Sequence, residues 1–404
     1  DIVNCSRGLD MIREANIHHA ATIFEPHITN LEALRKIRAN TSCLLSVVGS
    51  IMTPEEAESL LEEGSADLIM LGRSTLADPF WPVKAQMGHS EDIVPCIRCL
   101  QCYHVSTDHK NVQCSVNPRF NREKRVPLIL PVTGHPKHLV IVGGGPAGIT
   151  CALTASRRGH QVTLLEKEPV LTGKLNIACH GEHKADLRRF RDYLLTQLRK
   201  SSVTVHTGVL ADTDVVRDLK PDALVIAVGA TPSRIPLPGV DGDNCIQISE
   251  FLQSPDTSLQ HYIIIGGGSV GCETALDLAE KGKDVSIIEM ADCLASASND
   301  LYRLALSEHF ARYDNLHTYL NSACQSIDAD GVNVLTNGAS THISGDKVLL
   351  SLGFRPDAKQ VSSLYGIVPD TYYVGDCERI ATVAEAVNNA YFIGANVFQE
   401  QDII

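Results

Sequence analysis

A glycine-rich loop between an apolar strand and a helix occurs twice in this chain, and this repeat constrains the fold more than any other feature. The two loops are Gly143-Gly-Gly-Pro-Ala-Gly148 and Gly266-Gly-Gly-Ser-Val-Gly271. Each leads into a helical run, a glycine and a second strand that ends in an acid, Glu166 or Glu289. A single loop of this kind is weak evidence, but two in full strand–helix–strand context predict two doubly wound dinucleotide-binding folds.

The residue types in the first loop match what a pyrophosphate requires. Gly143 is expected to make the tight turn, Gly145 to leave room for the pyrophosphate, and Gly148 to let the helix pack closely on the strand. The helix N-terminus presents N–H groups to phosphates, and Glu166 can accept hydrogen bonds from a ribose. The same roles are predicted in the second copy for Gly266, Gly268, Gly271 and Glu289.

Glu289 also predicts which coenzyme the second loop binds. A carboxylate at the end of this strand accepts hydrogen bonds from both ribose hydroxyls, whereas a 2′-phosphate would meet a like charge. Residues 290–292 supply no arginine or lysine to offset that repulsion. The second loop is therefore expected to bind NADH in preference to NADPH.

Two further elements accompany the glycine loops. Gly229 and Gly353 each follow a Val/Leu-rich strand and precede a proline by three residues. Near the end of the chain, a strand closes on Gly375-Asp376 before a helix expected over residues 380–396. An aspartate in this place can bind a hydroxyl of a flavin's ribityl chain, although a turn would also use it.

Four of the 13 cysteines lie close together, at Cys96, Cys99, Cys102 and Cys114. Three thiolates at C-x2-C-x2-C spacing can surround one small cluster, and the fourth can arrive from a short loop, which favours an iron–sulfur centre. A structural zinc is the alternative, although four-cysteine zinc sites usually have two separated C-x2-C pairs. Chance clustering is the third explanation.

The first 92 residues predict a parallel sheet built from β-α-β-α-β. The expected strands are residues 1–5, 44–48 and 66–71. A helix over residues 30–39 is expected to be capped by Asn30, and a second helix to open with a capping box of Thr53 and Glu56.

Two of these strands end in glycine beside a polar residue, Gly49-Ser50 and Gly72-Arg73. In (β/α)₈ barrels the loops after strands 7 and 8 commonly bind a phosphate, and an arginine can hold it with two hydrogen bonds. These residues are therefore candidates for a phosphate site, although such glycines also serve ordinary turns. His18 and His19, expected in the loop after the first strand, are weaker candidates for chemistry.

Composition excludes several function classes. The chain has 404 residues, with 35 Lys and Arg against 48 Asp and Glu, a net charge of −13 that opposes binding to nucleic acid or an anionic membrane. No uncharged apolar run approaches the ~18 residues of a membrane helix, and the first residues lack a signal-peptide pattern. We therefore expect a cytoplasmic protein with reduced thiols and a small-molecule substrate, and the sequence is compatible with a homo-oligomer.

Together these motifs resemble the C-terminal two-thirds of the NADH:flavin oxidoreductases related to 2,4-dienoyl-CoA reductase, enoate reductase and trimethylamine dehydrogenase. The resemblance extends over essentially the whole chain and rests on the run 72–79, the four cysteines, both glycine loops and Gly375-Asp376. It implies an α/β fold with the end of an FMN-type (β/α)₈ barrel, a [4Fe-4S] segment, and an FAD domain with an NAD(P)H domain inserted into it.

The implied domains are a partial barrel at 1–92, the four-Cys segment and linker at 93–135, the FAD domain at 136–258 and 341–404, and the NAD(H) domain at 259–340. About three of the eight barrel units are present, so most FMN contacts and the catalytic residues cannot be assigned. The implied cofactor contacts are Gly49, Ser50, Gly72, Arg73, Gly143, Gly145, Pro146, Ala147, Gly148, Glu166, Lys167, Gly173, Lys174, Gly229, Gly266, Gly268, Ser269, Val270, Gly271, Glu289, Gly353, Gly375 and Asp376.

Two departures from the family pattern stand out. The segment after the first acid usually carries Gly-Gly, but here it is Thr172-Gly173. No C-x4-C redox pair follows the first glycine loop, which disfavours a disulfide reductase and leaves the iron–sulfur centre as the electron outlet.

The resemblance implies an enzyme in which electrons pass from NADH through FAD and [4Fe-4S] to FMN, for reduction of an activated C=C bond. One alternative is an electron-input subunit similar to the small subunit of glutamate synthase, which uses NADPH and normally carries two clusters. Another is an inactive chain that only binds dinucleotides. Oxidation of NADH with a dye acceptor would distinguish the inactive chain from the enzyme.

Overall fold

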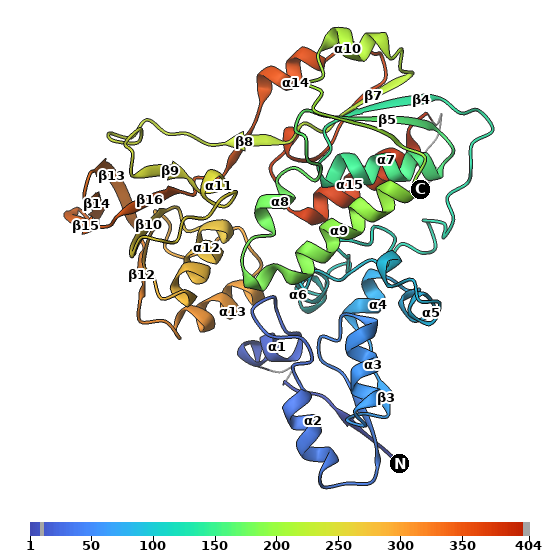
Figure 1. The fold of residues 1–404 in the computed structure, drawn as a ribbon, viewed down its shortest axis with the longest axis horizontal. Helices are drawn as coiled ribbons and strands as arrows, with labels where there is room; N and C mark the ends of the chain where they lie inside the picture. The colour runs from blue at the N-terminus through green and yellow to red at the C-terminus, as the bar shows by residue number, and fades with distance from the viewer. Residues whose placement is uncertain (9–11, 399–404) are drawn as a thin grey trace. The chain divides into compact units, whose positions relative to one another are not determined.

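The computed structural model describes residues 1–8 and 12–398, which form two compact units (Figure 1). Unit 1 contains residues 1–176, 185–230 and 356–404, and unit 2 contains residues 177–184 and 231–355. Both are built from parallel sheets and helices, which confirms the predicted α/β class. Within the described residues, no helix is both long enough and apolar enough to cross a membrane.

Unit 1 holds the first glycine loop on a five-stranded parallel sheet. The sheet order is β18-β7-β4-β5-β6, so the loop leaves β4 in the middle of the sheet, where strand connections diverge to either side. The three central strands, β7, β4 and β5, are almost fully buried because helices cover the sheet, whereas the edge strands β6 and β18 are more exposed. Their bounds are β4 (His138–Val142), β5 (Gln161–Glu166), β6 (Thr204–Thr207), β7 (Ala223–Ile226) and β18 (Thr371–Tyr373).

Helix α7 (Pro146–Arg157) follows this loop and packs closely against α15 (Val383–Asn396) from the end of the chain (Figure 1). A Cβ at Gly394 would lie 2.7 Å from the carbonyl oxygen of Cys151, so the two helices can approach only because glycine is there. The other helical elements after the loop are α8 (Leu175–Ala178), α9 (Ala185–Lys200), α10 (Thr213–Asp218), α14 (Ala358–Leu364) and η3 (Gly375–Cys377).

Unit 2 repeats this plan with the second glycine loop. Its parallel sheet has the order β12-β11-β10-β16-β9, and the loop again leaves the central strand, β10. An antiparallel sheet of three strands is inserted between β12 and β16. The strands are β9 (Cys245–Gln247), β10 (His261–Ile265), β11 (Asp284–Ile288), β12 (Leu316–Tyr319), β13 (Ser322–Asp328), β14 (Gly331–Thr336), β15 (Ala339–Ser344) and β16 (Lys347–Leu350), and the helices and 3₁₀ turn are η2 (Glu182–Lys184), α11 (Ile248–Phe251), α12 (Ser269–Glu280) and α13 (Asp300–Phe310).

Unit 2 is larger than the 259–340 expected for the inserted domain. Strands β9 and β16 lie outside that range but pair with the central sheet of unit 2, because β16 pairs with both β10 and β9. The chain passes between the units through β8 (Ala230–Pro232) and β17 (Phe354–Pro356), which form a two-stranded sheet. These strands contain the two prolines that follow Gly229 and Gly353.

The N-terminal part of unit 1 is a three-stranded parallel sheet, β1-β2-β3. Its apolar core includes Trp81, which is 5% exposed. The strands are β1 (Ile2–Cys5), β2 (Leu44–Val47) and β3 (Leu68–Ile69), and the helical elements up to the cysteines and just beyond are α1 (Arg13–His19), α2 (Leu31–Arg38), α3 (Pro54–Glu62), α4 (Arg73–Ala77), α5 (Trp81–Gln86), η1 (Ser90–Asp92) and α6 (Gln101–Thr107).

Four local predictions for this region have different outcomes. The capping box of Thr53 and Glu56 at the start of α3 is confirmed. Asn30 precedes α2, but its side chain makes no cap hydrogen bond, and its amide nitrogen instead donates to the carbonyl of Val48 at the neighbouring strand end. His18 belongs to helix α1 and not to a loop, and the last strand has two residues where six were expected.

Candidate functional site

The first glycine loop has the close approaches that the sequence predicts. Gly143 has φ +113°, and a Cβ there would lie 2.2 Å from the carbonyl oxygen of Ala227. A Cβ at Gly148 would lie 1.9 Å from the carbonyl oxygen of Gly143, so only glycine lets the helix start this near the strand. At Gly145 a Cβ would meet nothing within 4 Å. The space beside Gly145, at the start of α7, is open to a ligand.

Glu166 is held in place beside this loop. Its Oε2 accepts a hydrogen bond from the N–H of Gly144 at 2.7 Å, and its Oε1 accepts one from the N–H of Glu168 at 2.9 Å. The side chain is buried. A carboxylate with two backbone donors keeps a fixed orientation and has lone pairs left for further hydrogen bonds.

The second loop reproduces this geometry. Gly266 has φ +106°, and a Cβ there would lie 2.3 Å from the carbonyl oxygen of Ser351. A Cβ at Gly271 would lie 2.2 Å from the carbonyl oxygen of Gly266, while Gly268 again faces open space. Ser269 and Val270 form the first turn of α12.

Glu289 takes the place that Glu166 has in the first copy. Its Oε2 accepts from the N–H of Gly267 at 2.6 Å and its Oε1 from the N–H of Ala291 at 2.7 Å. In both copies 22 residues separate the middle glycine from the acid that it binds. The two loops therefore have the same backbone geometry and an equivalent carboxylate. Any difference in the ligands that they bind must come from the residues around them.

Thr172 is one such difference. It has φ +74° and is fully buried, with its Oγ1 2.8 Å from Oδ1 of Asn176. Its N–H donates to the carbonyl of Gly144 at 2.7 Å, as the N–H of Ala295 does to Gly267 in the second copy. Thr172 thus adopts the left-handed conformation that a glycine would adopt more easily, and the threonine is retained at this strained position by its hydrogen bonds.

The structure places Gly173, Lys174 and Gly375-Asp376 near the first loop. A Cβ at Gly173 would lie 3.5 Å from Cα of Gly145, and one at Gly375 would lie 3.1 Å from Cβ of Ala147. The ammonium group of Lys174 forms an ion pair with Asp376. Lys167 is exposed, and the backbone at Gly229 and at Gly353 is open, with nothing within 4 Å of an added Cβ.

The backbone of the cysteine segment turns sharply between the thiols. Arg98 and Leu100 both have left-handed conformations, with φ +47° and +58°. The N–H of Arg98 donates to Sγ of Cys96 at 3.4 Å, and Sγ of Cys99 lies 3.1 Å from Oγ of Ser115. Backbone N–H groups directed at sulfur favour thiolates and centres bound by thiolates.

All four cysteines line one cavity of unit 1, together with Arg73, Ser115 and apolar side chains. Within the described residues, no three of the four sulfurs lie within 4.8 Å of one another. Thiolates around a single zinc ion lie about 3.8 Å apart, given a Zn–S distance of about 2.3 Å in a tetrahedron. No three of these sulfurs are therefore as close together as the ligands of one bound zinc ion would be.

Burial is the largest influence on the pKa of three of these thiols, Cys96, Cys102 and Cys114. It raises the pKa of Cys96 to about 12, and it raises the pKa of Cys102 and of Cys114 above the ordinary value. The positive charge of Arg73 acts against this rise at Cys96 and Cys102. A cationic centre would be needed to keep these three thiols deprotonated at neutral pH.

A buried ion pair fixes the cysteine loop to the rest of unit 1. Nε of Arg98 lies 2.6 Å from Oδ2 of Asp186, and the two side chains are 4% and 1% exposed. Nη1 of Arg98 also donates to the carbonyls of Thr22 and Glu25 at 2.8 and 2.7 Å. Arg98 therefore connects the N-terminal sheet region, the cysteine segment and the start of α9.

His27 extends this network. Its Nε2 lies 3.1 Å from Oδ1 of Asp186, and its Nδ1 bonds to the carboxylate of Glu56. Burial alone would lower the pKa of His27, but the bonds to both carboxylates outweigh it and raise the pKa. Burial would likewise raise the pKa of Asp186, but the bond from His27 and the charge of Arg98 lower it to about 2.

The candidate phosphate residues of the N-terminal sheet lie together. Nη2 of Arg73 donates to Oγ of Ser50 at 2.9 Å, and Nη1 donates to the carbonyl of Ala21 at 2.8 Å. Gly49, next to Ser50, has φ +139°, and Gly72 directly precedes α4. The two strand-end loops that the sequence singled out are thus joined by Arg73.

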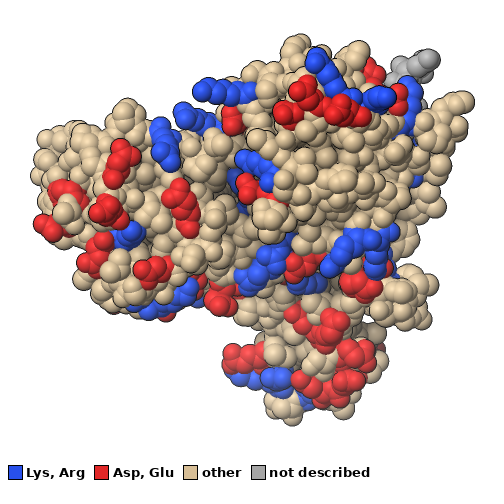
Figure 2. Space-filling model, turned by 45° about the horizontal axis from the view of Figure 1, so that its top comes forward, with Lys and Arg blue, Asp and Glu red and all other residues tan. Residues whose placement is uncertain are grey.

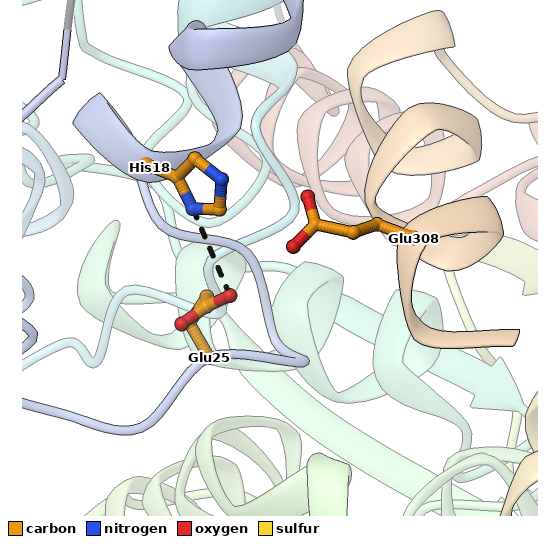
Figure 3. Close-up of side chains that lie close together, drawn as sticks. All are labelled: His18, Glu25 and Glu308. Atoms are coloured by element: carbon orange, nitrogen blue, oxygen red, sulfur yellow. Dashed lines mark ion pairs between the residues drawn. The ribbon is translucent and has the colours of Figure 1, made fainter. Parts of the chain in front are cut away.

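The two histidines make separate contacts. His18 lies in α1, with Nδ1 3.9 Å from Oε1 of Glu25 (Figure 3). His19 stacks on Tyr103 with ring centroids 5.9 Å apart. These contacts belong to local packing within unit 1.

Two features of the site escaped sequence reasoning. The N–H groups of Gly144 and Gly267 orient the acids, and the equal 22-residue spacing in the two copies was the available signal. The Arg98–Asp186 pair joins residues 88 positions apart, and no local pattern marks it.

Comparison with known proteins agrees with this geometry. Residues 137–390 match the pyridine nucleotide-disulphide oxidoreductase family, and residues 4–92 match the NADH:flavin oxidoreductase / NADH oxidase family. The NADH oxidase of Thermoanaerobacter brockii is 33% identical over 411 aligned residues, which cover 94% of this chain and 62% of that protein. The bilirubin reductase of Mediterraneibacter gnavus is 32% identical, with 96% and 62% covered.

A solved complex of 2-naphthoyl-CoA reductase is similar in structure, with a TM-score of 0.90, 26% identity, and coverage of 98% of this chain and 60% of that one. Histamine dehydrogenase from Rhizobium sp. 4-9 shares the fold, with a TM-score of 0.84 and 20% identity over 99% of this chain and 66% of that one. The chain spans about 60% of the length of the NADH oxidase, the bilirubin reductase and the 2-naphthoyl-CoA reductase. By these matches the chain belongs to the pyridine nucleotide-disulphide oxidoreductase family over residues 137–390, and residues 4–92 ahead of it carry a segment of the NADH:flavin oxidoreductase family.

Proposed function

We propose that this chain is the electron-transferring part of an NADH-dependent flavin oxidoreductase that reduces an activated C=C bond. The observation that carries the proposal is the cavity of four cysteines in the same compact unit as the first glycine loop. The bilirubin reductase of Mediterraneibacter gnavus and the cinnamate reductase of Clostridium sporogenes, which is 28% identical over 86% of this chain and 52% of that protein, support the reaction class.

The first glycine loop is proposed to bind FAD. The open space at Gly145 and the start of α7 suit the pyrophosphate, and Glu166 has lone pairs for the adenosine ribose. Asp376, which pairs with Lys174, follows the C-terminal end of β18, at the same edge of the parallel sheet as the first loop, where it can orient the ribityl chain. Bound flavin would supply the exchange between two-electron and one-electron steps.

The second loop is proposed to bind NADH through Gly268, the start of α12 and Glu289. The four cysteines would hold a [4Fe-4S] centre, and Gly49, Ser50, Gly72 and Arg73 would bind the phosphate of FMN. The surface fits a small-molecule enzyme, because basic and acidic side chains are interspersed on the face seen in Figure 2 and form no continuous basic area there.

Metal analysis tests the proposal. Protein purified without oxygen should contain about four irons and four sulfides per chain. Cys99→Ser should remove the broad visible absorption of the centre and leave bound FAD in place. Cys43→Ser is the matched control, because Cys43 belongs to the same unit but does not line the cavity, and it should keep its iron. One zinc per chain with no sulfide would contradict the assignment.

Turnover provides a second test. Oxidation of NADH with a dye acceptor should proceed in the loaded protein, because that reaction needs only the two dinucleotide sites. An absence of any oxidation, with FAD bound, would favour a chain that binds dinucleotides without catalysis.

A further inference from the structure

The fourth cysteine of the cavity, Cys114, reaches it from an irregular part of the chain. Cys96, Cys99 and Cys102 lie close together, just before and at the start of α6. Cys114 belongs to residues 108–137, which join α6 to β4 without a helix or strand. No ladder of backbone hydrogen bonds therefore fixes the position of Cys114, and other contacts of this segment with unit 1 have to maintain it.

Asn388, on helix α15, makes one such contact. Its Nδ2 donates to the carbonyl of Cys114 at 3.1 Å and to the carbonyl of Ala384 at 2.9 Å. Its Oδ1 accepts a hydrogen bond from Nη1 of Arg122 at 2.9 Å. Because two carbonyls need a donor and a guanidinium needs an acceptor, only one orientation of the amide satisfies all three partners. The side chain of Asn388 is 8% exposed, so water competes little for these hydrogen bonds.

Arg122 binds the same amide and belongs to the same irregular segment as Cys114. Its Nη1 also donates to the carbonyl of Pro118 at 2.9 Å. Its guanidinium lies over the ring of Phe392, with Cζ 5.1 Å from the ring centroid. Phe392 follows Asn388 by four positions on α15, so the two side chains share one face of the helix. The stretch from Cys114 to Arg122 is thus docked on that face of α15.

The start of α15 lies beside the proposed flavin site. The N–H of Ala381 donates to Oδ1 of Asp376 at 3.1 Å, and the side chain of Thr382 caps the helix. Asn388 follows Thr382 by six positions, or about 9 Å of helix at about 1.5 Å per residue. Helix α15 therefore connects the carboxylate that is proposed to orient the ribityl chain with the backbone of Cys114.

We propose that Asn388 is a positioning residue for the centre held by the four cysteines. It fixes the backbone of Cys114 to α15, so that this ligand stays in the cavity and at a constant distance from the flavin site. This inference rests on the proposed function, since it requires an iron–sulfur centre in the cavity. Transfer of one electron from reduced flavin to the oxidised centre makes and breaks no bond at Asn388, which acts only through the position of Cys114. Groups that orient a metal ligand in this way contribute about 10–100-fold to metal affinity or activity.

Asn388→Asp tests the proposal because it removes the donor and keeps the size of the side chain. The carboxylate can still accept a hydrogen bond from Arg122, but it repels the carbonyl oxygens of Cys114 and Ala384. Asn389→Asp is the matched control, since it introduces the same charge at the next position of α15, where the side chain is exposed. Proteins purified without oxygen are compared in two measurements: the rate at which a chelator removes iron, and the electron paramagnetic resonance spectrum of the reduced centre.

Iron should leave Asn388→Asp at least about tenfold faster than it leaves the control, and the resonance spectrum of the reduced centre should change. Stopped-flow measurements separate this effect from a general loss of structure. NADH should reduce FAD at the wild-type rate in both variants, because neither glycine loop is altered. Transfer of the electron from the flavin to the centre should be slower in Asn388→Asp alone.

A second pair of variants keeps Asn388 in place. Arg122→Met removes the hydrogen bond that orients the amide of Asn388 but retains an apolar side chain against Phe392. Iron should again leave faster than from its control, Arg125→Met, in which an exposed arginine of the same segment is changed. This pair decides the question if Asn388→Asp does not fold.

The outcomes separate the two claims. Wild-type protein that contains no iron and sulfide would overturn the proposed function. If Asn388→Asp contains the centre but matches Asn389→Asp in iron release and in resonance spectrum, the role of Asn388 is overturned and the centre itself stands. The same holds for Arg122→Met against Arg125→Met where that pair is used instead.

Discussion

Asp186→Asn tests whether the buried ion pair at the start of α9 stabilises unit 1. The substitution keeps the size of the side chain and one carbonyl oxygen but removes the negative charge. Arg98 would keep its hydrogen bonds to the carbonyls of Thr22 and Glu25, yet its buried charge would lose its counter-charge. The cost comes mainly from that uncompensated charge.

Two estimates give the magnitude. Breaking a buried pair by removing one partner costs about 3–5 kcal/mol. The pKa of Asp186 gives the second figure: burial would raise it, but His27 and Arg98 lower it from 3.8 to about 2. At 1.36 kcal/mol per pH unit this difference is worth about 2.5 kcal/mol. We therefore expect Asp186→Asn to lower the free energy of unfolding by about 2.5–5 kcal/mol at pH 7.

The pH dependence follows from the direction of the shift. Because the pKa of Asp186 is lower in the folded protein than in the unfolded chain, its stabilisation is present above about pH 4 and is lost as the pH falls toward 2. The difference between wild type and Asp186→Asn should therefore narrow over that interval.

Urea unfolding followed by tryptophan fluorescence is the assay. Trp81 is the only tryptophan of the sequence and lies in the core of the N-terminal sheet of unit 1. Asp92→Asn is the matched control, because Asp92 pairs with Lys200 at the other end of α9, with side chains 28% and 46% exposed, and such pairs contribute about 0–1 kcal/mol. Equal losses in the two variants would refute the reasoning.

Three further outcomes are expected. With an artificial acceptor, kcat/KM for NADH should be at least about tenfold higher than for NADPH, because Glu289 repels a 2′-phosphate. Equal values would mean that Glu289 does not face the ribose. Gly145→Ala should leave the urea midpoint unchanged but weaken retention of FAD on gel filtration, since its Cβ meets no protein atom within 4 Å; unaltered retention would argue against pyrophosphate there. His27→Gln should destabilise the protein more at about pH 5.5 than at about pH 9. The pKa of His27 is raised in the folded protein, so its charged form stabilises the fold below the pKa of the unfolded chain, and this stabilisation is lost as the pH rises. A difference in the free energy of unfolding between wild type and variant that does not change with pH would exclude a charged His27.

The sequence was sufficient for the two glycine-loop folds because their determinants are local. Gly143 and Gly266 must be glycine for steric reasons visible in the structure, and the strands before them begin and end within one residue of the expected positions. The capping box at Thr53 is equally local and was equally predictable.

The features that the sequence did not predict depend on contacts between residues far apart in the chain. Strand β9 joins the sheet of unit 2 by pairing with β16, and the partners Cys245 and Val348 lie 103 positions apart in the sequence. The three residues of β9 alone could not show that it belongs to this sheet. Asn30 makes no cap hydrogen bond, and its side chain is bound instead to the carbonyl of Val48, 18 positions away in the sequence. Asp186 looks from the sequence like an ordinary acid in the first turn of a helix, and only the fold brings Arg98 and His27 to it.

The interleaving of the two units has a consequence for synthesis of the protein. Unit 2 ends at Arg355, so a ribosome has delivered all of it before β18 and α15 of unit 1 are translated. Unit 2 can then fold as a finished body, while the sheet of unit 1 still lacks an edge strand and α7 still lacks the helix that packs on it. The first dinucleotide site is thus completed after the second, although its loop leaves the ribosome first.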